Sequence, residues 1–134
     1  MFGRATLRIR VGAAGAVVCA AVICIPPAQA ADLAAAEQQF TTSCGTCHTV
    51  AEDAPPRQGP NLHSAYGRPA GALPDFKYSA VLKTGGWTWD ETTLDPWIEN
   101  AQVTHPGTFM NYRQADPAKR QLIIQYLKSL APPN

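Results

Sequence analysis

The chain has 134 residues and a formal net charge of +1 at pH 7. Its length fits a single domain, and its nearly balanced charge excludes the strongly basic surface by which proteins bind nucleic acids. It contains four cysteines, three histidines and two methionines, a small set of side chains able to bind a metal through sulfur or nitrogen.

Residues 1–30 have the pattern of an export signal. Three arginines precede an apolar run over residues 11–25, and Ala28-Gln29-Ala30 supplies the small residues that a signal peptidase reads. The run is shorter than the ~20 residues that span a bilayer. We expect a signal peptide over residues 1–30, cleaved after Ala30, and one domain over residues 31–134 in the bacterial periplasm. A retained membrane anchor is the alternative.

Cleavage would change the composition of the chain. Cys44 and Cys47 would remain as the two thiols and Met110 as the single methionine. Loss of three arginines from eleven basic residues leaves eight against ten acidic ones, a net charge of −2. We therefore expect no nucleic-acid partner. We also expect a monomer that does not span the membrane after cleavage. A domain this small gains stability from a buried cofactor.

The first expected helix leads to the cysteines. Leu33, Ala36 and Phe40 recur at helical spacing before Cys44, and Asp32 is a plausible N-cap.

The middle of the chain favours loops and short helices. Residues 51–74 are rich in glycine and proline and predict a loop. A short helix is expected over 78–83. Thr88-Trp89-Asp90-Glu91 has the form of a capping box that opens a helix toward Asn100. Pro96 either kinks this helix or restarts it with Asp95 as N-cap.

Asp116-Pro117 begins the last expected helix. Its apolar face is formed by Leu122, Ile123, Tyr126, Leu127 and Leu130. With no alternating strand pattern, the sequence predicts an all-α domain of three to five short helices and long loops. Loops of that length in a compact domain indicate a cofactor around which they wrap.

Cys44-Gly45-Thr46-Cys47-His48 admits three interpretations. A redox dithiol needs a low-pKa cysteine, usually in a βαβ context that this chain lacks. A structural zinc site needs a further ligand pair, whereas His63 and His105 are isolated. Covalent attachment of haem c fits every residue of the motif, with two thioethers and an axial imidazole. We interpret the motif as the site of one covalent haem.

Three side chains can supply the second axial ligand. His63 is interpreted as a loop histidine bonded to backbone, and His105, which precedes Pro106, as an exposed turn residue. Met110 follows a Pro-Gly turn and is the preferred ligand, although a lone methionine can also serve as core packing. The iron ligands are then His48 and Met110.

The chain resembles class I c-type cytochromes of the mitochondrial cytochrome c and bacterial cytochrome c2 group from about residue 36 to residue 130. Besides the haem motif, the resemblance includes Gly59-Pro60-Asn61-Leu62-His63, Tyr66-Gly67-Arg68, Phe76-Lys77-Tyr78-Ser79, Thr88-Trp89-Asp90-Glu91, Pro106-Gly107-Thr108-x-Met110 and Ile123-x-x-Tyr126-Leu127-Lys128.

This resemblance implies a small cytochrome c fold and a set of cofactor-binding residues. The implied set comprises Cys44, Cys47, His48, Pro60, Arg68, Tyr78, Trp89, Thr108 and Met110. The carbonyl of Pro60 is expected to accept the imidazole proton of His48. Arg68, Tyr78, Trp89 and Thr108 match positions that hold the haem propionates. Phe40 is expected to meet Ile123 and Tyr126 where the first and last helices cross.

The implied function is electron transport rather than enzymatic catalysis. We expect Fe(III)/Fe(II) cycling in a six-coordinate haem, with redox proteins as donor and acceptor and transfer through the exposed haem edge. The alternative is a haem protein with a labile Met110, acting as a peroxidase-like or ligand-sensing site.

Several residues depart from the family pattern. Ala36 replaces the usual glycine at the helix crossing, Trp97 replaces a tyrosine near the methionine, and Leu82 replaces a polar residue. Most lysines that surround the haem edge in mitochondrial relatives are absent, and Gln102 and Phe109 occupy two of these positions. We therefore expect weak electrostatic steering.

Overall fold

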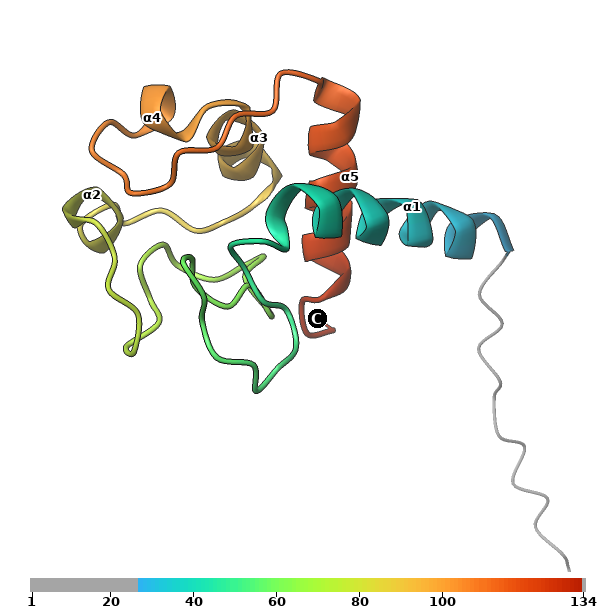
Figure 1. Cartoon of the computed structure of the whole chain (residues 1–134), viewed down its shortest axis with the longest axis horizontal. Coiled ribbons are helices and arrows are strands. Elements are labelled where there is room, and N and C mark those ends of the chain that lie inside the picture. The colour runs from blue at the N-terminus through green and yellow to red at the C-terminus, as the bar shows by residue number, and fades with distance from the viewer. Residues whose placement is uncertain (1–26, 134) are drawn as a thin grey trace, which may run out of the picture.

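The computed structural model describes residues 27–133, in which the chain forms five helices and only an isolated β-bridge between Pro69 and Thr88. The helices are α1 (Pro27–Cys44), α2 (Ala80–Lys83), α3 (Glu91–Glu99), α4 (Ala101–Thr104) and α5 (Pro117–Ser129). Long loops join them (Figure 1). The expected all-α architecture of short helices and long loops is confirmed. None of the described helices is long and apolar enough to cross a membrane.

The core is organised by the crossing of α1 over α5 (Figure 1). Ala36 has no exposed surface at this crossing, and the rings of Phe40 and Tyr126 lie 5.0 Å apart, centroid to centroid. Ile123 belongs to the same buried cluster. The expected contact of Phe40 with α5 is therefore confirmed. Leu33, by contrast, is 38% exposed and lies outside the cluster.

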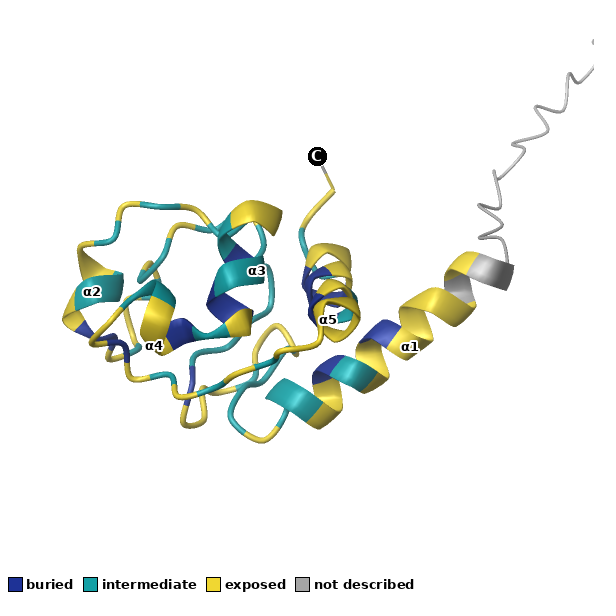
Figure 2. Ribbon diagram, turned by 90° about the horizontal axis from the view of Figure 1, so that it is seen from above, coloured by how far each residue is buried: buried dark blue, intermediate teal, exposed yellow. Residues whose placement is uncertain are grey.

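The start of α1 differs from expectation, because the helix begins at Pro27 and Asp32 is an interior residue rather than the N-cap. Proline is well tolerated in the first turn, and the alanine-rich residues that follow favour helix, so the pattern extends beyond Asp32. Residues 31–35 are exposed (Figure 2). The rest of the expected signal peptide, residues 1–26, lies outside the described residues.

The N-terminus of α3 is capped by Asp90, not by Thr88. The Asp90 carboxylate accepts hydrogen bonds from the backbone N–H groups of Thr92 and Thr93, and the Thr93 hydroxyl accepts one from the Asp90 N–H. This reciprocal pair is a capping box two residues later than expected. Pro96 lies within the continuous helix, so the restart with Asp95 as N-cap is wrong.

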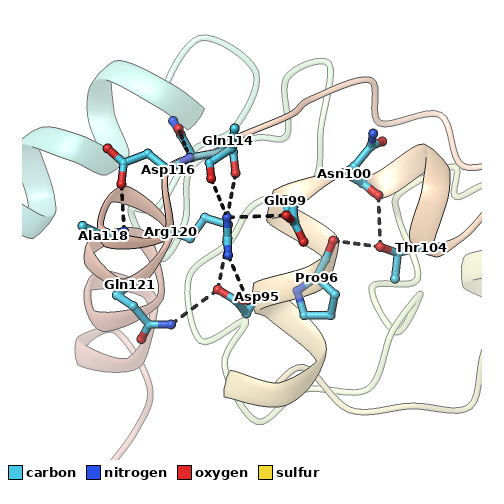
Figure 3. Close-up of polar contacts among 11 residues, drawn as sticks. Asp95, Pro96, Glu99, Asn100, Thr104, Gln114, Asp116, Ala118, Arg120 and Gln121 are labelled. Carbon is cyan, nitrogen blue, oxygen red and sulfur yellow. Dashed lines mark hydrogen bonds and ion pairs between the residues drawn. The ribbon is translucent and has the colours of Figure 1, made fainter.

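A nearly buried arginine joins α3 to α5 (Figure 3). Arg120 donates from Nε and Nη2 to the two carboxylate oxygens of Asp95, at 2.9 and 3.3 Å. Its Nη1 donates to the carbonyls of Gln114 and Ala115, at 3.1 and 3.0 Å. One planar guanidinium therefore fixes α3, α5 and the segment before α5 relative to one another.

The start of α5 agrees with expectation, because Asp116 caps its N-terminus by accepting from Ala118 N–H. Lys128 lies in its last turn. Its buried residues include Ile124, which the expected apolar face omitted, while Leu122 is only partly buried. The expected helix near residue 80 is shortened to Ala80–Lys83.

Replacing Ala36 by leucine tests the crossing. The larger side chain has no space between α1 and α5, and A36L should lower the free energy of unfolding by about 1–3 kcal/mol. Chemical denaturation would measure the change. The matched control is A35L, at an exposed position of the same helix. Equal stability of the two variants would contradict close packing at Ala36.

Candidate functional site

The end of α1 places the Cys-x-x-Cys-His motif. α1 ends at Cys44, and the N–H groups of Cys47 and His48 both donate to the Cys44 carbonyl, at 3.0 and 2.9 Å. The Gly59 N–H donates to the Cys47 carbonyl at 2.8 Å, which brings the following loop back onto the motif. Both thiols and the imidazole therefore occupy one tight turn at the helix terminus.

The His48 imidazole is held by the returning loop. Its Nδ1 lies 2.8 Å from the carbonyl oxygen of Pro60, the contact that the family resemblance implies. Burial lowers the pKa of His48, and the bond to Pro60 opposes that shift in part. A neutral ring that donates through Nδ1 leaves the Nε2 lone pair free to bind a metal.

Gly59 is required for this arrangement. A Cβ atom at Gly59 would lie 2.3 Å from Cε1 and 2.6 Å from Nδ1 of His48. Since real Cβ atoms do not approach ring atoms this closely, the loop backbone can lie against the imidazole only without a side chain there.

The thiol environment argues against a redox dithiol. Burial, with a smaller effect of Cys47, raises the pKa of the Cys44 thiol to about 12. A reactive dithiol requires the opposite shift, because the thiolate is the nucleophile. A zinc site also lacks support, since no group of three or more His, Cys, Asp or Glu side chains placed to hold a metal occurs within residues 27–133.

A cavity of about 350 Å³ adjoins the motif. All nine residues singled out from the sequence line it: Cys44, Cys47, His48, Pro60, Arg68, Tyr78, Trp89, Thr108 and Met110. Apolar side chains from α3 and α5, among them Leu94, Ile98 and Ile123, complete much of its wall. Residues from the whole length of the domain thus converge on one site.

Hydrogen-bond donors line part of the same cavity. Arg68 is held by donating to the carbonyls of His63 and Asn61, both at 3.0 Å. Burial raises the pKa of Tyr78, which keeps its hydroxyl protonated. Ser79, which the sequence analysis did not single out, is 1% exposed, and its Oγ has no hydrogen-bond partner in the described chain. Ser79 belongs to the cavity wall, and a buried hydroxyl without a protein partner favours a polar group that the described chain does not supply.

The two other histidines lie outside this cavity wall. His63 Nδ1 is 3.2 Å from the Val50 carbonyl, as expected for a loop histidine bonded to backbone. The expectation for His105 was wrong. Its ring is half-buried and stacks on Trp87, with 4.1 Å between centroids and 3° between planes. His105 is half-buried because Trp87, 18 residues earlier in the sequence, covers its ring. The residues next to His105 in the sequence give no indication of this contact.

The chain belongs to the cytochrome c family, whose sequence profile matches residues 33–131. Cytochrome c of Nigella damascena is 37% identical over 102 residues, covering 75% of this chain and 92% of that protein. Cytochrome c2 of Rhodomicrobium vannielii is 37% identical over 113 residues, covering 84% and 90%. Members of this family carry one covalently attached haem c and act as electron carriers rather than enzymes, and we assign both properties to this chain.

The cavity fits a haem group. It offers two thiols and a neutral imidazole at one end of α1, apolar walls, and donors for carboxylates, among them the unpartnered Ser79 hydroxyl. Haem requires this combination, because its ring is apolar and its propionates are anionic.

Replacing Gly59 by alanine tests the fit of the imidazole. The added Cβ should displace His48 from Pro60 and reduce haem incorporation by about tenfold or more, in line with the loss of other contacts that orient metal ligands. The ratio of haem to protein, from absorbance and mass spectrometry, measures the effect. P56A, in the same loop, is the control. G59A with the haem content and spectrum of the wild type would contradict the prediction.

Proposed function

We propose that this chain is an exported single-electron carrier in which Cys44 and Cys47 bind haem through thioethers and His48 and Met110 ligate the iron. The observation that carries the proposal is the convergence of both thiols, the imidazole and the single thioether of the mature chain on one cavity. When bound, the haem supplies the Fe(III)/Fe(II) couple, and a thioether ligand favours a higher potential than a second histidine.

The chain's own residues then fix the site. Pro60 orients the imidazole of His48 through the 2.8 Å contact and makes it a better donor. The surrounding apolar side chains exclude water, which keeps the polarity of the site low. Rigid ligands in a dry site need little rearrangement when the charge changes, as electron transfer requires.

We assign the polar part of the cavity to the haem propionates. Arg68 supplies a positive charge there, while Tyr78 and Thr108 supply hydroxyls and Trp89 an indole N–H. To these the structure adds Ser79, whose buried hydroxyl lacks a protein partner among the described residues. Buried carboxylates need such charge-assisted hydrogen bonds to offset their loss of water.

The proposed compartment is the bacterial periplasm. The support comes from the leader pattern of residues 1–30 and from similarity to a bacterial cytochrome c2. Export before folding agrees with covalent attachment, which retains the haem outside the cytoplasm. Cleavage after Ala30 would remove the first turn of α1 and leave the crossing at Ala36 intact.

The function is tested on protein purified from an exporting host with a working haem-maturation system. We expect a c-type visible spectrum, a reversible one-electron titration, and the mass of residues 31–134 plus one haem. The reduced protein should bind carbon monoxide slowly and incompletely at neutral pH, because Met110 occupies the iron. Colourless protein would refute the proposal, and rapid, complete binding would favour the ligand-sensing alternative.

We further propose that redox partners contact an apolar surface at the cavity. Phe109 lines the cavity and is 70% exposed, in a chain whose mature net charge is −2. Electrostatic steering is therefore a small part of association. We propose that this surface recognises both its redox partners, the electron donor and the electron acceptor, by shape and apolar contact.

Two coated electrodes test this surface. Electron transfer should be efficient on a methyl-terminated monolayer and insensitive to salt, and weak on a carboxylate-terminated one. F109S should lower the rate on the methyl surface several-fold, whereas the control L33S, at an exposed position of α1, should not. Transfer only on the carboxylate surface, lost on adding salt, would contradict the proposal.

A further inference from the structure

The segment that carries Met110 runs from the end of α3 to the start of α5 and has only the single turn of α4 as regular structure. Side-chain contacts therefore add to the few backbone hydrogen bonds that hold it in place, such as that from the Gln114 N–H to the Ile98 carbonyl at 3.0 Å. Segments with few regular hydrogen bonds open more readily than the core, so each such contact affects how often Met110 leaves the cavity.

The first of these contacts is made by Gln102, in α4. Its Nε2 donates to the carbonyl oxygens of Thr108 at 2.8 Å and Met110 at 3.0 Å. The Thr108 hydroxyl in turn accepts from the Met110 N–H at 3.3 Å. One side-chain amide thus bridges both ends of the short stretch that presents Met110.

The second contact is the stack of His105 on Trp87, at 4.1 Å and nearly parallel. His105 also lies 5.6 Å from Trp97, which lines the cavity. Its backbone N–H donates to the Ala101 carbonyl at 2.9 Å. The stack therefore ties the methionine segment to the loop before α3, across 18 residues of sequence.

We propose that Gln102 and the His105–Trp87 stack are positioning elements that keep Met110 in the cavity and slow its replacement by other ligands. This inference rests on the proposed function, since it assumes that Met110 ligates the iron. It adds two elements that the expected site did not contain.

The variant Q102E tests the amide clamp. Glutamate has the same length, but when ionised it can only accept hydrogen bonds, so both bonds to carbonyls are lost. Loss of two neutral hydrogen bonds should make displacement of Met110 from the ferric protein by added imidazole about tenfold faster. The weak absorption band of the methionine–iron(III) bond follows this displacement directly.

The matched control is Q125E. It makes the same substitution at an exposed position of α5, whose side chain has no hydrogen bond among the contacts of the described residues. Its rate of imidazole displacement should equal that of the wild type. This comparison controls for the change in the net charge of the protein.

Variants of His105 test the stack independently of Gln102. H105S removes the ring and should accelerate displacement several-fold, whereas H105F retains a flat ring against Trp87 and should restore a rate close to that of the wild type. A merely structural role would lower the denaturation midpoint without changing the displacement rate, and that result would overturn the proposal.

The outcomes distinguish this inference from the function on which it rests. Absence of the methionine–iron band in the wild type would overturn ligation by Met110, and the clamp with it. Presence of the band, with equal displacement rates in Q102E and Q125E and in H105S and H105F, would overturn the clamp alone.

Discussion

The packing of α1 across α5 is the contact on which the rest of the site depends. Ala36 and Phe40 are buried against α5, so α1 meets it in one position, and α1 ends at Cys44. The turn bonds to the Cys44 carbonyl then set Cys47 and His48. Arg120 connects α5 to α3, which supplies the opposite apolar wall of the cavity. Both walls are therefore positioned by the same helix, and the distance between them is fixed by packed side chains rather than by the loops.

The loops are long because the cofactor takes the place of a larger hydrophobic core. The cavity of about 350 Å³ is lined mainly by apolar side chains, which lack packing partners unless an apolar group binds there. An apolar ring bound in the cavity therefore contributes to the stability of the fold. Residues 45–79, which contain no helix, gain their order from turn hydrogen bonds and from this wall.

The sequence predicted what depends on neighbouring residues and missed what depends on distant ones. The helix delivering Cys44 and the Asp116 cap could be read locally, and the His48–Pro60 contact only through resemblance to a family. The cap of α3 was misplaced because two capping patterns overlap, one starting at Thr88 and one at Asp90. The structure uses Asp90, because the Thr93 side chain accepts a hydrogen bond from its backbone N–H. The stack of His105 could not be read, because its partner is 18 residues away and no local pattern joins them.

The methionine side of the site shows how one physical requirement is met by different side chains. The resemblance to class I cytochromes implies polar residues at the positions of Leu82 and Trp97. In this chain the rings of Trp89 and Trp97 lie 5.1 Å apart, centroid to centroid, and those of Trp87 and Trp89 lie 5.5 Å apart. A polar network in a dry site stabilises it only if every member is satisfied. Aromatic packing has few rotatable bonds to order and only one N–H per tryptophan to satisfy, although Trp87 Nε1 is buried without a hydrogen-bond partner among the described residues. An electron carrier needs a site that keeps its geometry when the charge on the haem changes. The packed tryptophan rings meet this need, because they contain no hydrogen-bond network that would have to reorient.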